Sequence, residues 1–147
     1  MTVTFCGHSN LYDRDGSIGA KLVEVLAQLI ADGADQFYIG GYGAFDSLAA
    51  KTVKDLQKVH PQIHSTLVLP YLNRQYNEKL YNDTTYPPLE EVPRRYAISR
   101  RNEWMVDQAD VVVSYVDHGW GGAAKTLEYA QRKKKRVINL AQRDEQK

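Results

Sequence analysis

The chain has 147 residues and a formal net charge of +1 at pH 7, with 25% charged and 43% hydrophobic residues. This length is usual for one domain, and the composition is that of an ordinary globular protein. The near-zero net charge argues against a general attraction to nucleic acid or anionic membranes, so we expect nucleic acid to be an unlikely partner. The single cysteine, Cys6, excludes an internal disulfide and a zinc site built from several thiolates.

The sequence also argues against a membrane protein. No stretch approaches the roughly 18 consecutive apolar residues that a membrane-spanning helix needs. The N-terminus lacks the basic start of a signal peptide and begins with a short apolar run typical of a strand. We therefore expect a cytoplasmic protein with no membrane partner.

In the first half of the chain, strand-like and helix-like segments alternate. Residues 3–6 form a short run rich in β-formers, and residues 18–31 carry apolar residues at helical spacing. A second short strand is predicted at 36–39, a second helix at 45–59, and a third strand at 64–69. The alternation predicts strands joined by crossover helices, which is the arrangement of a parallel sheet.

The second half begins with residues 71–95, a stretch rich in proline and tyrosine that shows no sustained period and is typical of a lid over a site. A helix at 96–108 is followed by the clearest strand, 110–116, which is apolar on both faces as a central parallel strand should be. A helix at 121–134 and a strand at 136–140 complete the chain. We predict one domain over residues 1–147, a three-layer α/β sandwich with a mainly parallel, about five-stranded sheet.

Three glycine-bearing turns follow predicted strands. They read C-G-H-S at residues 6–9, G-G-Y-G-A-F-D at 40–46 and G-W-G-G-A-A-K-T at 119–126. The carboxyl ends of parallel strands share one sheet edge, where glycines and helix N-termini offer backbone N–H groups to a phosphate. None of the turns matches the G-x-G-x-x-G or P-loop pattern, which argues against a generic NAD-dependent dehydrogenase or an NTPase.

These turns predict a cleft for a small, nucleotide-like phosphate ligand. Asp46 lies in the first turn of a helix, where it either stabilises the helix dipole or bonds a ribose hydroxyl. Trp120, in a glycine-rich loop, is a candidate for stacking on a base. His8 has no evident second ligand in the sequence, so we expect neither a metal site nor a cofactor. The residues expected to bind the ligand are Gly7, His8, Ser9, Gly40, Gly41, Gly43, Asp46, Gly121, Gly122 and Thr126.

The turns, together with L-V-L-P-Y at 67–71, R-N-E-W-M-V-D at 101–107, A-D-V-V-V at 109–113 and G-G-A-A-K-T-L-E-Y-A at 121–130, resemble one family over nearly the whole chain. The chain resembles the SLOG superfamily, the Rossmann-like group that includes DprA and the LOG-type phosphoribohydrolases. Within it, the likeness is greatest to the YoqJ/YpsA-like bacterial and phage group. The resemblance implies a Rossmann-like fold and a nucleotide-derived ligand.

The LOG enzymes cleave the N-glycosidic bond of a nucleoside monophosphate, and the resemblance places their arginine on Arg101 and their glutamate on Glu128. An arginine can clamp a phosphate with two parallel N–H bonds, and a glutamate can act at an anomeric carbon. The chain departs from the family motif, because Trp120 replaces a proline and Ala124 and Lys125 replace glycine and threonine. These departures favour binding over hydrolysis.

Three readings of function remain open at this stage. The first is a binding or sensor module for a nucleotide-derived ligand, and the second is a hydrolase that uses Arg101 and Glu128. The third, single-stranded nucleic acid binding, needs a basic groove with stacking aromatics, which the balanced charge disfavours. The basic run at 132–136 fits a helix C-terminus and a solvated turn better than a nucleic-acid patch. A homodimer is the expected assembly.

Overall fold

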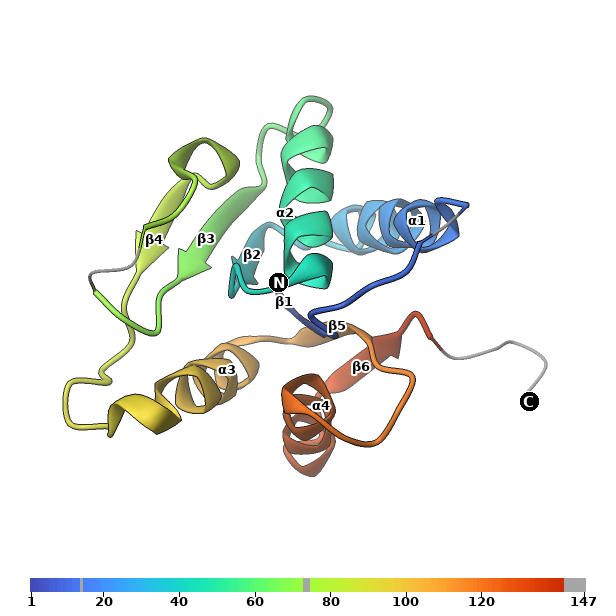
Figure 1. Ribbon diagram of the computed structural model, residues 1–147. Helices are drawn as coiled ribbons and strands as arrows, with labels where there is room; N and C mark the ends of the chain where they lie inside the picture. Colours follow the sequence, from blue (N-terminus) through green and yellow to red (C-terminus); the bar gives the residue numbers. More distant parts are fainter. Residues whose placement is uncertain (14, 73–74, 142–147) are drawn as a thin grey trace.

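The computed structural model describes residues 1–13, 15–72 and 75–141. In this part of the chain, one sheet of six strands has the order β4-β3-β2-β1-β5-β6, and every neighbouring pair is parallel (Figure 1). The strands are β1 (Thr2–Gly7), β2 (Gln36–Ile39), β3 (His64–Val68), β4 (Asp83–Thr85), β5 (Val111–Tyr115) and β6 (Arg136–Asn139).

Helices cover both faces of the sheet, which confirms the predicted α/β class. The helices are α1 (Ser17–Ala31), α2 (Ala44–Gln57), α3 (Ala97–Gln108) and α4 (Gly122–Arg132). Figure 1 shows α1 and α2 on one side of the sheet and α3 and α4 on the other. Two single-turn 3₁₀ helices, Glu78–Leu80 and Arg94–Tyr96, lie between β3 and α3.

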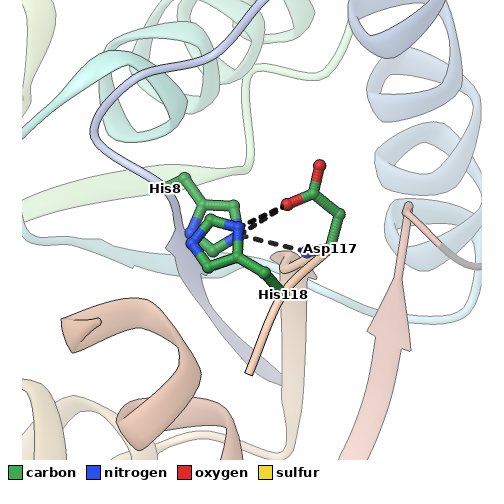
Figure 2. A group of neighbouring side chains, drawn as sticks. All are labelled: His8, Asp117 and His118. Carbon is green, nitrogen blue, oxygen red and sulfur yellow. Dashed lines mark hydrogen bonds and ion pairs between the residues drawn. The ribbon is translucent and has the colours of Figure 1, made fainter. Parts of the chain in front are cut away.

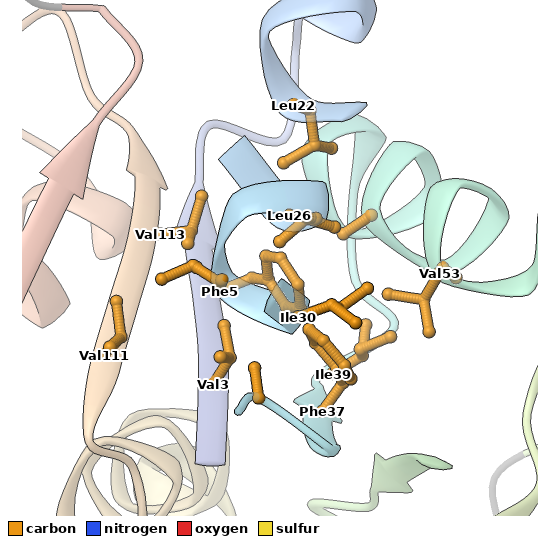
Figure 3. Close-up of a cluster of buried hydrophobic side chains, with 14 of the residues drawn as sticks. Val3, Phe5, Leu22, Leu26, Ile30, Phe37, Ile39, Val53, Val111 and Val113 are labelled. Atoms are coloured by element: carbon orange, nitrogen blue, oxygen red, sulfur yellow. The ribbon is translucent and has the colours of Figure 1, made fainter. Parts of the chain in front are cut away.

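The larger hydrophobic core lies between the sheet and the pair α1 and α2 (Figure 3). Alternate residues of β5 serve opposite faces, because Val111 and Val113 belong to this core while Val112 packs with Cys6 and Val106 on the α3 and α4 side. All three valines are at most 1% exposed. This explains the run of apolar residues in β5, since a central parallel strand is buried on both faces.

The sheet has six strands rather than about five, because β4 forms inside the segment 71–95 that was expected to be irregular. Three polar residues carry no apolar pattern that would reveal a strand. Backbone bonds hold β4 on β3: Leu69 N–H donates to Thr85 O at 2.8 Å and Asn82 N–H donates to Ser65 O at 3.1 Å. Residues 73–74 lie outside the described residues; in the rest of the segment, Glu78–Leu80 lies against α2 and Arg94–Tyr96 against α3.

The chain winds outward in both directions from the boundary between β1 and β5. Strands β2, β3 and β4 follow on one side of β1, and β5 and β6 lie on the other. At such a switch point the loops after the two central strands diverge and leave a crevice at the carboxyl edge, where ligands bind in open α/β sheets. In the described residues, no helix is long and apolar enough to span a membrane.

Candidate ligand-binding cleft

A cleft of about 370 Å³ lies at the carboxyl ends of β1 and β5. Four segments line it: residues 5–10, part of the second glycine turn, the inner side of α3, and the third glycine turn with the start of α4. This volume is in the range of small-molecule sites, roughly 300–1,000 Å³. Of the predicted site residues, the following line the cleft: Gly7, His8, Ser9, Asp46, Gly121, Gly122 and Thr126 from the binding set, and Arg101 from the predicted catalytic pair.

Gly40, Gly41 and Gly43 are not among the residues that line the cleft. Their neighbourhood is filled by protein instead of being open to a ligand. A Cβ at Gly41 would lie 2.5 Å from the Leu67 side chain, and one at Gly43 would lie 2.6 Å from Ser9 Cα. These glycines allow close packing of the second turn.

The first turn packs against the second. A Cβ on Gly7 would lie 2.3 Å from the ring of Phe45, so only glycine allows β1 to run this close to the start of α2. The Ala44 N–H, at the first position of α2, donates to Ser9 O at 2.9 Å. Asp46 Oδ2 accepts a hydrogen bond from the Tyr42 N–H at 3.1 Å and so ties the loop before α2 to its first turn.

The third turn is open. Gly121 adopts φ 93° and ψ 175° immediately before α4, and in the described part of the chain no side chain caps this helix N-terminus. A Cβ added at Gly119, Gly121 or Gly122 would meet nothing within 4 Å. The first N–H groups of a helix have no partner within it and carry a partial positive charge, so this terminus can accept an anionic group from the cleft.

Beside this turn, the structure reveals a cluster that the sequence did not indicate: His8, Asp117 and His118 (Figure 2). Asp117 Oδ1 lies 3.1 Å from His8 Nε2 and 2.8 Å from His118 Nδ1. His8 Nε2 also accepts a hydrogen bond from the Asp117 N–H at 3.0 Å. Strand pairing therefore brings two further potential ligand groups to His8 that the sequence did not indicate.

The electrostatics of this cluster favour a neutral His8 beside an ionised carboxylate. Burial and the nearby His118 lower the pKa of His8, while Asp117 opposes that shift. The hydrogen bond from His118 is the main reason that the pKa of Asp117 is lowered. The rings of His8 and His118 stack at 3.7 Å, and His118 stacks on Trp120 at 3.8 Å, so three aromatic rings form a ladder at the cleft.

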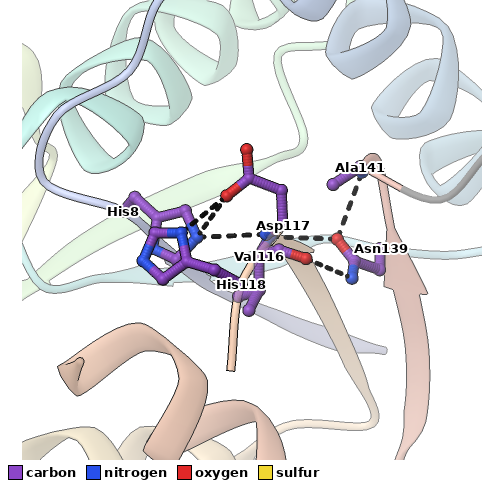
Figure 4. Close-up of polar contacts among 6 residues, drawn as sticks. All are labelled: His8, Val116, Asp117, His118, Asn139 and Ala141. Carbon is purple, nitrogen blue, oxygen red and sulfur yellow. Dashed lines mark hydrogen bonds and ion pairs between the residues drawn. The ribbon is translucent and has the colours of Figure 1, made fainter. Parts of the chain in front are cut away.

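A side chain on β6 fixes the backbone that carries the cluster (Figure 4). Asn139 Oδ1 accepts hydrogen bonds from the N–H groups of Val116 at 3.1 Å and Ala141 at 3.2 Å. Asn139 Nδ2 donates to Val116 O at 3.0 Å. The residue before Asp117 is thereby held on both its N–H and its C=O.

Solved structures share this fold. One is the X-ray structure of TM1055, with a TM-score of 0.64 and 19% identity, covering 93% of this chain and 72% of that one. Another is DNA processing protein A from Helicobacter pylori, described by its single-stranded DNA binding mode, with a TM-score of 0.67, 17% identity, and coverage of 98% and 66%. DNA processing protein A (DprA) from Streptococcus pneumoniae has a TM-score of 0.64, 18% identity, and coverage of 92% and 48%.

The chain shares a DprA-like, Rossmann-type fold with these structures. This confirms the resemblance seen in the sequence, as far as the fold is concerned. No family model matches the chain, and no curated protein matches it in sequence. The chain spans about two thirds of the H. pylori protein and about half of the S. pneumoniae protein.

One expectation about partners is wrong. The balanced charge led us to regard nucleic acid as an unlikely partner, yet a protein with this fold is described by its binding of single-stranded DNA. A net charge near zero therefore does not exclude nucleic acid for the DprA-like fold, because binding depends on where the charges lie and not on their sum.

The DprA-like fold also separates the two residues that the LOG resemblance pairs. Arg101 borders the cleft, but Glu128 lies on the exposed face of α4 beside a different groove, with Ser99 and Glu103. Thr126 takes the inward position and donates to Gly122 O at 3.0 Å. Two residues along a helix are rotated by roughly 200°, so these neighbours face opposite sides.

Arg101 is 1% exposed, and its guanidinium donates hydrogen bonds to backbone groups of other elements. Nη1 donates to Gly40 O and to Val68 O, both at 2.8 Å. Nε donates to the side chain of Asn102 at 2.8 Å. These bonds join α3 to the second glycine turn and to the end of β3, a structural role that the sequence did not indicate.

Proposed function

We propose that the chain is a binding module for a nucleotide-like ligand, whose phosphate lies at the start of α4 and whose base stacks on Trp120. The observation that carries the proposal is the open third turn. Among the described residues, nothing fills the space that its glycines face, and no side chain caps the helix N-terminus beside them. Backbone N–H groups at such a terminus are a recurrent phosphate site in α/β proteins.

Aromatic residues supply the second half of the site. Trp120 is 72% exposed although it lines the cleft, and one stacked neighbour, His118, holds its ring. Tyr42 lines the cleft as well. A pre-ordered, exposed indole offers stacking surface at low entropic cost, and base–aromatic stacking contributes about 1–3 kcal/mol per base.

Binding without turnover fits the position of Glu128. A general acid or base has to reach the reacting group directly or through one water. The exposed face of α4 directs Glu128 to a groove that does not include the cleft residues. The proposal is therefore a sensor or carrier module, in line with the replacement of the hydrolase glycine and threonine by Ala124 and Lys125.

A thermal-shift screen tests the proposal with nucleoside monophosphates, ADP-ribose, NAD and cyclic nucleotides. A ligand at a hundred times its dissociation constant adds about 2.7 kcal/mol of stability. We expect one of these compounds to stabilise the wild type and to bind Trp120→Ala at least about tenfold more weakly, because the variant lacks the stacking surface. Tyr12→Ala is the matched control, since Tyr12 is 75% exposed but does not line the cleft.

Two results would overturn the proposal. The first is binding of an oligodeoxynucleotide with no response to any small nucleotide, which would assign the cleft to an extended strand. The second is release of adenine from a nucleoside monophosphate by the wild type, abolished in Glu128→Gln, in a chromatographic assay. That outcome would show that Glu128 acts on the ligand despite its outward position.

A further inference from the structure

We propose that His8, Asp117 and His118 form a binding site for a divalent transition-metal ion such as Zn²⁺. Among the described residues, they are the one group of three potential ligands whose donor atoms all lie within 4.8 Å of one another. The proposal is independent of the nucleotide, since it rests on these three side chains alone.

The donor set has the chemistry that zinc prefers. Two imidazoles and one carboxylate are a recurrent set of three protein ligands, and they leave one position of a tetrahedral ion open. Donors at roughly 2.0–2.2 Å from one ion lie about 3–3.5 Å from one another. The Asp117 Oδ1 separations of 3.1 Å from His8 Nε2 and 2.8 Å from His118 Nδ1 are close to that spacing.

The ligands come from two adjacent strands and are held by backbone bonds. Gly7 of β1 pairs with Tyr115 of β5, and the His8 N–H donates to Tyr115 O at 3.3 Å. His8 Nε2 accepts the Asp117 N–H, so the lone pair that a metal would use already points into the cluster. An ion replaces that hydrogen bond and the one from His118 Nδ1 to Asp117 Oδ1, whose proton leaves when the ion binds. The contacts of Asn139 keep Val116 and the following loop in place.

Metal binding has to change the ring stack. The rings of His8 and His118 are parallel to within 3°, and nitrogen lone pairs lie in the ring plane, so the two rings must tilt to reach one ion. His118 is the ring that can turn, because its side chain is 32% exposed against 11% for His8. Since His118 stacks on Trp120, the tilt changes the surroundings of the indole, so ion binding should change the fluorescence of Trp120.

A second histidine–aspartate pair provides a matched control. His64 Nε2 lies 3.0 Å from Asp83 Oδ2 at the β3–β4 edge. This pair has a similar distance, and its exposure is closer to that of the His118–Asp117 pair than to that of the His8–Asp117 pair. Among the described residues, it does not belong to a group of three ligands. A single imidazole–carboxylate pair should therefore bind zinc far more weakly than the cluster.

The test is a titration of the metal-free protein with Zn²⁺, without nucleotide, in a Trp104→Phe background where Trp120 is the only tryptophan. We expect a saturable change in Trp120 fluorescence with one ion bound per chain. His118→Gln, His8→Gln and Asp117→Asn should each weaken binding by about 100-fold or more, because even removal of an outer partner costs 10–100-fold. His64→Gln should bind as the parent does.

Imidazole NMR on the unsubstituted chain supplies a measurement that needs no variant. Of the four histidines, His8 and His118 should shift on addition of Zn²⁺ while His60 and His64 stay unchanged. Equal shifts at all four, or variants that bind zinc as tightly as the parent, would disprove the site. A failed nucleotide screen would leave this result untouched, so the two proposals fail separately.

Discussion

Gly43 and Gly121 have the same backbone and opposite surroundings. Each immediately precedes a helix, α2 or α4, with φ 96° and ψ 177° at Gly43 and φ 93° and ψ 175° at Gly121. This region of the backbone map is open to glycine almost alone. At Gly43 the space is occupied by Ser9, whereas at Gly121 nothing lies within 4 Å of the Cβ direction.

The difference shows two uses of one glycine pattern. In the second turn, Ser9 O accepts a hydrogen bond from the first N–H of α2, and Arg101 donates one to the carbonyl of Gly40. The protein thus satisfies these backbone groups itself, and the turn packs against the first turn and α3. In the third turn, no side chain of the described residues caps the helix N-terminus beside the cleft, so its first N–H groups are available to the proposed ligand.

The largest expected effect comes from removing the arginine that closes the second turn. Arg101→Ala should lower the free energy of unfolding by about 4–8 kcal/mol, because two buried carbonyls lose their donor and a cavity forms. A loss of this size approaches the whole stability of many small domains. Urea denaturation measures it, and Arg100→Ala at an exposed position should stay within about 0.5 kcal/mol of wild type. A stable Arg101→Ala protein would show that the second turn does not depend on these bonds.

The glycine pair itself gives the next effect. Gly43→Ala should cost about 2–6 kcal/mol, from backbone strain and a clash with Ser9, whereas Gly121→Ala should cost about 1–3 kcal/mol from strain alone. Since the dihedral angles match, the difference isolates the packing of the second turn. Equal losses in urea melts would mean that Ser9 moves aside, and the contrast between the turns would disappear.

The sequence predicts the fold well and the site in part, and this glycine pair shows why. Strand and helix order follow from local patterns, so the elements around β1, β5 and α4 are predicted to within a few residues. Whether a glycine packs or opens depends on Ser9, which is more than 30 positions away. The His8–Asp117 contact likewise spans 109 positions and arises only from the pairing of β1 with β5.

Glu128 illustrates the other limit. The family motif placed it by spacing, but the phase of α4 directs Thr126 inward and Glu128 outward. Spacing alone does not fix which face a residue takes when the helix start differs. The six-stranded count was missed because β4 has only three polar residues.

A smaller effect on stability is expected at the open turn. Gly122→Ala should change the free energy of unfolding by no more than about 0.5–1 kcal/mol, and in the stabilising direction, because alanine favours a helix over glycine. The same methyl group projects into open space beside the cleft and should weaken binding of the nucleotide that the thermal-shift screen identifies. Paired urea and binding titrations separate the two effects. A loss of stability with unchanged binding would place Gly122 with the packing glycines.

The smallest expected effect is a pH dependence of stability that comes from His8 in the first glycine turn. This turn contacts both the second and the third turn. The folded pKa of His8 lies below its ordinary value of 6.5, chiefly because of burial and then because of His118. As the pH falls, the unfolded chain therefore binds this proton before the folded chain does. The contribution of His8 to the free energy of unfolding is complete above about pH 6.5, decreases between that pH and the lowered pKa of the folded state, and does not decrease further below it. The slope should be well below the roughly 1.4 kcal/mol per pH unit of one fully coupled proton, since water and the Asp117 carboxylate screen the group.

Urea denaturation from about pH 7.5 down to about pH 5 measures this effect. The free energy of unfolding should decline over this range in the wild type and decline less in His8→Gln. His64→Gln provides the control, because its exposed pair with Asp83 lies at the far edge of the sheet. A decline that persists unchanged in His8→Gln would assign the proton to another group and remove the first turn from the pH response.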